Sequence, residues 1–165
     1  MNYNIAVEDI VKMAIKIEEN GEMVYRYLTK QFEVEEIKQL FKLLADQETY
    51  HRSYFEGLLS TLIKGPQSQM SLDRDKLDYL KGFAGEHVFL PDNVLALVGK
   101  KIGSKIEVFD FALLAEKETA EFYEKLLGLI PVEERAGVER IIVQERNHYQ
   151  ILTKEKEKII NSGGK

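Results

Sequence analysis

The sequence predicts an all-α protein: a four-helix bundle of two antiparallel helix hairpins, with a long crossover between its second and third helices. Long stretches carry apolar residues three or four positions apart, the spacing of a helix with one buried face. The three prolines do not interrupt these stretches. The two halves of the chain also repeat a common pattern. At 165 residues, the length suits a single domain spanning residues 1–165.

The four long helices are expected at about 7–31, from the turn at 31–34 to about 64, at 104–128 and at 131–160. Ser104 and Glu107 have the spacing of a capping box at the start of the third helix. Pro131 is tolerated in the first turn of the fourth. We expect the tail, 161–165, to be disordered.

The crossover occupies about 64–103 and is expected to be partly helical, with short helices near 75–83 and 92–98. A connection of this length lets the third helix start at the same end of the bundle as the second, as in bundles with one crossover. We therefore interpret it as part of the same domain.

Composition excludes several classes of function. The net charge of −5 disfavours nucleic acid as a partner, and no apolar run approaches the roughly 20 residues needed to span a membrane. The N-terminus lacks the pattern of a secretory signal, so a cytoplasmic protein is expected. Because the chain has no cysteine, a metal ion must be held by oxygen and imidazole nitrogen, a donor set that suits iron, manganese or zinc.

The internal repeat contains the residues of greatest chemical interest. Glu18 and Tyr25 recur 98 residues later as Glu116 and Tyr123. The second part of the repeat, 97 residues apart, matches Gln47, Glu48 and His51 with Gln144, Glu145 and His148. Such matching hairpins indicate duplication of a two-helix unit.

Two Glu-x-x-His pairs, Glu48–His51 and Glu145–His148, are candidate metal ligands. Residues three apart on a helix share a face, so the carboxylate and the imidazole of one pair can bind the same ion. Both pairs continue the apolar stripe of their helix, and buried charges are rare unless they are paired or bound to metal. The alternative is an ordinary ion pair or a core histidine, which the repetition of the pair disfavours.

Glu18 and Glu116 complete the candidate set, because each continues the apolar stripe of its own helix. In an antiparallel hairpin, Glu18 and Glu48 reach one level if the turn lies near residue 33, within the predicted turn. Glu116 and Glu145 reach one level if the turn of the second hairpin lies at 130–131, where the sequence has a proline. Four glutamates and two histidines around two metal ions are the known ligand set of ferritin-like di-iron bundles.

The chain resembles the di-iron domain of rubrerythrins, within the ferritin-like superfamily, over all four long helices. The resemblance lies in the segments 14–25, 44–51, 115–123 and 144–148. It implies that Tyr25 and Tyr123 hydrogen-bond ligand carboxylates. It also implies a homodimer, and a site that reduces hydrogen peroxide or dioxygen. Two features differ from rubrerythrins: the sequence lacks the cysteines of a rubredoxin domain, and Thr119 stands where the family has an extra glutamate, with Glu118 and Glu121 off the ligand face.

We therefore expect a non-haem di-iron oxidoreductase of the oxidative-stress type, with peroxidase-like activity. Its two iron ions would be re-reduced by an external donor, such as a rubredoxin-type protein. Iron oxidation for storage or detoxification is one alternative, and a non-catalytic metal-binding scaffold or sensor is another. His87, beside Glu86 in the crossover, is expected to be structural or exposed.

Overall fold

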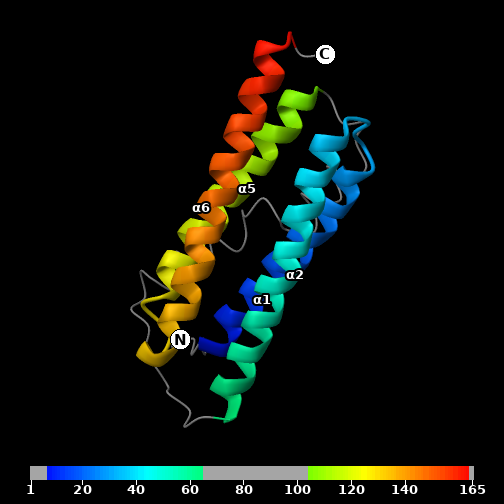
Figure 1. The fold of residues 1–165 in the computed structure, drawn as a ribbon. Coiled ribbons are helices and arrows are strands. Elements are labelled where there is room, and N and C mark those ends of the chain that lie inside the picture. Colours follow the sequence, from blue (N-terminus) through cyan, green and yellow to red (C-terminus); the bar gives the residue numbers. More distant parts are fainter. Residues whose placement is uncertain (1–6, 65–103, 164–165) are drawn as a thin grey trace, which may run out of the picture.

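The computed structural model describes residues 7–64 and 104–163, and within these ranges the chain is all-α. These two ranges contain four helices: α1 (Val7–Thr29), α2 (Glu35–Lys64), α5 (Lys105–Leu126) and α6 (Val132–Asn161) (Figure 1). The helices α1 and α2 form one antiparallel hairpin, and α5 and α6 form the other. The predicted all-α bundle is thereby confirmed.

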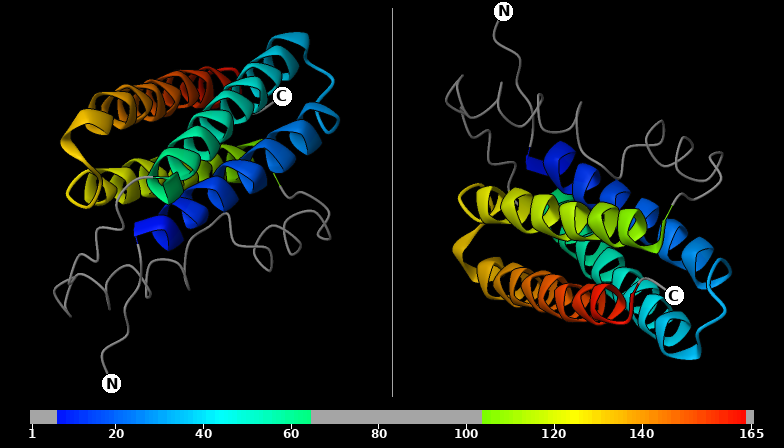
Figure 2. Two further views of the ribbon diagram at one scale, coloured as in Figure 1. Left: turned by 90° about the horizontal axis from the view of Figure 1, so that it is seen from below. Right: turned by 90° about the horizontal axis from the view of Figure 1, so that it is seen from above.

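The two hairpins lie side by side with their turns at opposite ends of the bundle (Figure 1). As a result α5 begins at the end of the bundle where α2 begins, not where α2 ends. This connectivity is the one expected of a single long crossover. Between the hairpins, α1 packs on α5 and α2 packs on α6, and each of these pairs is antiparallel (Figure 2). The four helices therefore surround one core that both hairpins line.

The helix ends follow local chemistry. Ser104 caps α5: its side chain accepts a hydrogen bond from the Glu107 amide at 3.2 Å, and the Glu107 carboxylate accepts one from the Ser104 amide at 2.8 Å. Pro131 lies at the N-cap of α6, where its missing N–H leaves no helical hydrogen bond unmade. The predicted turns at 31–34 and 130–131 both fall between helices.

Aromatic rings fill the core between the hairpins. Phe41 on α2 stacks on Phe32 with ring centroids 5.4 Å apart, and it lies 5.6 Å from Phe109 on α5. Phe55 on α2 packs against Tyr123 on α5, with centroids 4.8 Å apart. Burial of one such side chain contributes about 1.5–3 kcal/mol. These contacts therefore hold the second hairpin against the first.

Several sequence predictions concern residues outside the described ranges. They include the short helices near 75–83 and 92–98 and the pair Glu86 and His87. Of the predicted tail, Asn161 is helical and residues 162–163 form a turn. Among the helices that the structure describes, none has the length and apolar character needed to cross a membrane.

Candidate metal centre

A cluster of acidic and imidazole side chains interrupts the apolar core, with at least one member on each helix. Each member is at most 2% exposed: Glu18, Glu48, His51, Glu116, Glu145 and His148. Removing charged groups from water costs several kcal/mol each unless opposite charge is close by. A cluster buried to this extent therefore requires protons or cations to balance its carboxylates.

The cluster divides into two overlapping groups, each with four donor atoms within 4.8 Å of one another. One group contains Glu18 and His51, the other contains Glu116 and His148, and both contain Glu48 and Glu145. The two carboxylates in common lie on α2 and α6, one from each hairpin. This geometry suits two cations that share two bridging carboxylates.

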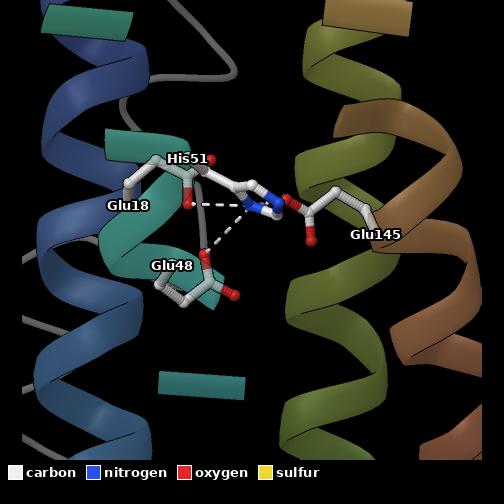
Figure 3. A group of neighbouring side chains, drawn as sticks. All are labelled: Glu18, Glu48, His51 and Glu145. Carbon is white, nitrogen blue, oxygen red and sulfur yellow. Dashed lines mark ion pairs between the residues drawn. The ribbon is translucent and has the colours of Figure 1, made fainter. Parts of the chain in front are cut away.

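His51 reaches from α2 across the space between the hairpins (Figure 3). Its Nδ1 atom lies 2.8 Å from Glu145 Oε1 on α6, 3.6 Å from Glu18 Oε2 on α1 and 3.9 Å from Glu48 Oε2. One imidazole nitrogen thus faces carboxylates from three helices. The three oxygens and this nitrogen form the first group of donor atoms.

His148 occupies the corresponding place in the second group. Its Nδ1 lies 3.1 Å from Glu145 Oε2, 3.2 Å from Glu116 Oε2 and 4.0 Å from Glu48 Oε1. The rings of His148 and His51 are stacked with centroids 5.9 Å apart. Both histidines therefore present the same nitrogen, Nδ1, to the carboxylates.

Three polar atoms in the first group have no hydrogen-bond partner although they are fully buried: Glu18 Oε2, His51 Nδ1 and Glu145 Oε1. The last two are 2.8 Å apart, but they are not aligned as a hydrogen bond. Buried polar atoms are normally satisfied, and one cation between these three would satisfy all of them. Because carboxylate oxygen with imidazole nitrogen is a donor set for iron, manganese or zinc, the residues present fit such an ion.

Burial and neighbouring charges displace the pKa values of Glu48, Glu116 and Glu145 in the metal-free protein. Burial raises the pKa of Glu48 well above its usual range, and the charges of Glu18 and Glu145 raise it further. Burial also raises the pKa of Glu116 to about 8, although His148 opposes this change. Glu145 differs: burial disfavours its charge, but both histidines lower its pKa below the ordinary value.

The histidines are shifted towards the charged form. Burial alone would lower the pKa of His51, but the carboxylates of Glu145 and Glu18 outweigh burial and raise the pKa to about 11. Burial would likewise lower the pKa of His148, but the carboxylates of Glu116 and Glu145 outweigh burial and raise it to about 10. Without metal, protons on these imidazoles and on part of the carboxyl groups balance the negative charge.

Two tyrosines connect the hairpins through these carboxylates. The hydroxyl of Tyr25 on α1 donates a hydrogen bond to Glu116 Oε1 on α5, and that of Tyr123 on α5 donates one to Glu18 Oε1 on α1. Burial raises the pKa of both phenols, and the adjacent carboxylates raise it further. Each tyrosine therefore remains a proton donor to a carboxylate of the opposite hairpin.

Two glutamines also contact the cluster, a role that the sequence did not reveal. His51 Nε2 lies 3.0 Å from Gln144 Oε1, and His148 Nε2 is hydrogen-bonded to Gln47 Oε1. The signal was present, because a glutamine immediately precedes the glutamate of each Glu-x-x-His pair. What the sequence could not show is that each glutamine contacts the histidine of the other hairpin.

Thr119 lies one helical turn after Glu116 on α5 and is 2% exposed, so it is buried on the same side as the cluster. Within the described residues, neither Glu118 nor Glu121 belongs to the two groups of donor atoms. No further carboxylate therefore joins the cluster from this part of α5.

A four-helix bundle that buries glutamates and histidines in this arrangement belongs to the class of ferritin-like carboxylate proteins. The chain is a member of the Rubrerythrin family, which it matches over residues 9–156. It is similar to a crystal structure from Thermotoga maritima described as a ferritin-like diiron-carboxylate protein. That similarity has a TM-score of 0.70 and 30% identity, and covers 95% of this chain and 98% of the other. A comparison with curated proteins found no match.

Proposed function

We propose that this protein is a di-iron oxidoreductase that reduces hydrogen peroxide or dioxygen with electrons from an external donor. The observation that carries the proposal is the pair of donor groups sharing Glu48 and Glu145. Membership of the Rubrerythrin family and the description of the Thermotoga maritima relative favour iron over manganese or zinc.

In this proposal Glu48 and Glu145 would be ligands available to both ions, because they belong to both groups of donor atoms. Glu18 with His51 completes one ligand set, and Glu116 with His148 completes the other. Four carboxylates carry the charge that two divalent cations neutralise. The protons that now balance the cluster must therefore leave when metal binds.

Two bound ferrous ions would supply the two electrons that convert one hydrogen peroxide, with two protons, into two waters. The protein's own contribution is to hold the ligands rigidly in a site closed to bulk water, since every candidate ligand is at most 2% exposed. The hydroxyls of Tyr25 and Tyr123 keep their protons. That of Tyr25 orients the carboxylate of Glu116, and that of Tyr123 orients the carboxylate of Glu18.

We propose that the electrons come from a separate molecule or domain; the absence of cysteine, which excludes an iron–sulfur centre in this sequence, supports this. A rubredoxin-type protein is the class of donor that we propose. A homodimer is the assembly that we propose, on the family resemblance.

Stopped-flow oxidation of the anaerobic ferrous protein tests the proposal. With two irons bound per chain, we expect hydrogen peroxide to oxidise the site faster than dioxygen does. Glu19→Ala changes a glutamate that is exposed and pairs with Lys16 outside the cluster, so this variant should react with both oxidants at the rates of the parent. Faster oxidation by dioxygen, with a solution mass of a large hollow assembly, would indicate iron oxidation for storage instead. A loaded protein that consumes neither oxidant would be a scaffold or sensor.

A further inference from the structure

Gln47 and Gln144 occupy equivalent places in a crossed arrangement around the cluster. Each lies on a helix one residue before a glutamate common to both donor groups, and each contacts a histidine on the facing helix. Gln47 on α2 contacts His148 on α6, 101 residues away, and Gln144 on α6 contacts His51 on α2, 93 residues away. Both contacts are made by the imidazole nitrogen Nε2, on the far side of the ring from the carboxylates.

The chemistry of imidazole gives these contacts a direction. A neutral imidazole carries one proton, and the nitrogen without it is the one that can bind a cation. The amide oxygen of glutamine accepts hydrogen bonds and cannot donate them. A contact between Nε2 and this oxygen therefore requires the proton on Nε2. When a cation displaces the proton from Nδ1, the nitrogen that faces the carboxylates, the imidazole is left neutral with its lone pair on Nδ1.

We propose that Gln47 and Gln144 are positioning residues that hold His148 and His51 with the Nε2 proton outward and the Nδ1 lone pair toward the metal centre. The inference rests on the proposed function for the presence of metal, but not for the redox reaction. It deepens that proposal, because it assigns the orientation of both nitrogen ligands to residues outside the ligand set. Nδ1 is the ring nitrogen that faces the carboxylates, 2.8 Å from Glu145 Oε1 in His51 and 3.1 Å from Glu145 Oε2 in His148, so it is the nitrogen placed to bind a cation held by these oxygens.

The crossed pairing also makes the two halves of the site depend on each other. One segment of α2 provides a carboxylate common to both donor groups and the amide that orients the histidine of the second group. The equivalent segment of α6 does the same for the first group. The position of α2 against α6 therefore sets both halves together, and a change in one glutamine should be detected at the histidine of the opposite hairpin.

A neutral amide suits this place because the cluster already has four carboxylates. Two further carboxylates at positions 47 and 144 would leave two divalent cations with excess negative charge. A carboxylate partner also strengthens an imidazole as a ligand more than a neutral acceptor does. The glutamines thus orient the imidazoles without adding charge to the site.

The test is nuclear magnetic resonance of the intact chain labelled with nitrogen-15 at histidine, in the metal-free form and loaded with zinc, which is diamagnetic. We expect Gln47→Leu to increase the exchange of the His148 Nε2 proton with water at least about tenfold while leaving His51 unchanged. Gln144→Leu should do the reverse. Zinc affinity should fall by about tenfold to a hundredfold in each leucine variant.

Matched variants separate positioning from packing. Gln47→Glu keeps an acceptor oxygen at the same distance from the backbone, so slow exchange at His148 should return. Gln39→Leu and Gln150→Leu make the same change at exposed positions of α2 and α6 and should match the parent. Leucine variants with unchanged exchange at the opposite histidine, or with the change at the histidine of their own helix, would overturn the inference. Failure of the proposed function is a separate result, in which the metal-loaded parent reacts with neither oxidant.

Discussion

The hydroxyl of Tyr123 on α5 donates a hydrogen bond to Glu18 on α1, across the interface between the two hairpins and 105 residues away in the chain. Tyr25 makes the reciprocal bond to Glu116. The tyrosine rings are fixed by the core, since that of Tyr123 packs on Phe55 and that of Tyr25 stacks on Phe41, with centroids 6.0 Å apart. Core packing thereby sets the orientation of carboxylates in the candidate metal centre.

Tyr123→Phe should weaken both the fold and metal binding. The substitution leaves Glu18 Oε1 buried without its donor, which costs about 1–3 kcal/mol of the free energy of unfolding in the metal-free protein. Metal affinity should fall about tenfold to a hundredfold, because the carboxylate loses its orienting partner. Urea denaturation and a competition titration with a chelator measure the two effects. Tyr149→Phe, at an exposed position on α6, is the control and should match the parent.

Glu48→Ala and Glu145→Ala should each reduce metal content below two ions per chain. Both residues belong to both donor groups, so either change removes a ligand from each ion. Glu19→Ala removes an exposed carboxylate from the same bundle and should leave two ions bound. Elemental analysis after loading and desalting provides the count. Equal metal content in all three variants would show that the cluster is not the binding site.

Stabilisation by metal should increase as pH rises from about 6 to about 8. The pKa values of His51, His148 and Glu116 are raised in the folded metal-free protein, to about 11, about 10 and about 8. Their contribution to stability is complete below the unfolded pKa, about 6.5 for histidine and about 4.3 for glutamate, and is lost as pH rises through the folded values. The metal-free protein therefore becomes less stable as pH rises. Over the same range metal binds more tightly, because fewer protons compete with it for the carboxylates and imidazoles.

Melting temperatures with and without zinc, at three pH values in this range, measure the effect. The zinc concentration is the same at each pH, so the stabilisation follows the change in the dissociation constant and amounts to about 4 kcal/mol where zinc is about a thousand times that constant. Calorimetric titration in buffers of different ionisation enthalpy should show proton release on binding. A zinc-induced shift that shrinks with rising pH would contradict the assignment of protons to the cluster.

Thr119→Glu should speed oxidation of the ferrous site by hydrogen peroxide relative to the parent. Thr119 is buried one turn after Glu116, so a carboxylate at this position would lie on the same face and within reach of an ion. The resemblance to rubrerythrins, which carry a glutamate here, gives the direction of the change. Thr119→Gln has the same shape without the charge and should not gain rate. If the glutamate variant is oxidised by hydrogen peroxide no faster than the parent, Thr119 is not the residue that makes this protein differ in peroxide rate from rubrerythrins.

Much of the fold follows from local patterns that the sequence displays. The capping box at Ser104 was predicted at the residue where α5 begins, because capping depends on side chains within one turn of the helix. The turns near 33 and 130 followed from the requirement that paired glutamates reach the same level. The candidate ligands could be named because each lies on an apolar helical stripe, where a charged side chain requires a special reason.

The partners across the bundle could not be read from the sequence in the same way. The resemblance to rubrerythrins implied that Tyr25 and Tyr123 bind carboxylates, but not that each binds the carboxylate of the opposite hairpin. The repeat placed Gln47 and Gln144 beside the glutamates common to both donor groups without assigning them any contact. Their hydrogen bonds depend on how α2 is aligned with α6, and a helical period carries no information about this alignment.

The sequence by itself determined the four helices, their buried faces and the residue types that can bind metal, because these depend on spacing along one chain segment. Only the tertiary structure decided that Glu48 and Glu145 are common to two donor groups and that both histidines present Nδ1 to them. It also decided the crossed hydrogen bonds of the tyrosines and glutamines. The physical reason is that these relationships join residues about a hundred positions apart, and aromatic packing between the hairpins sets their relative position.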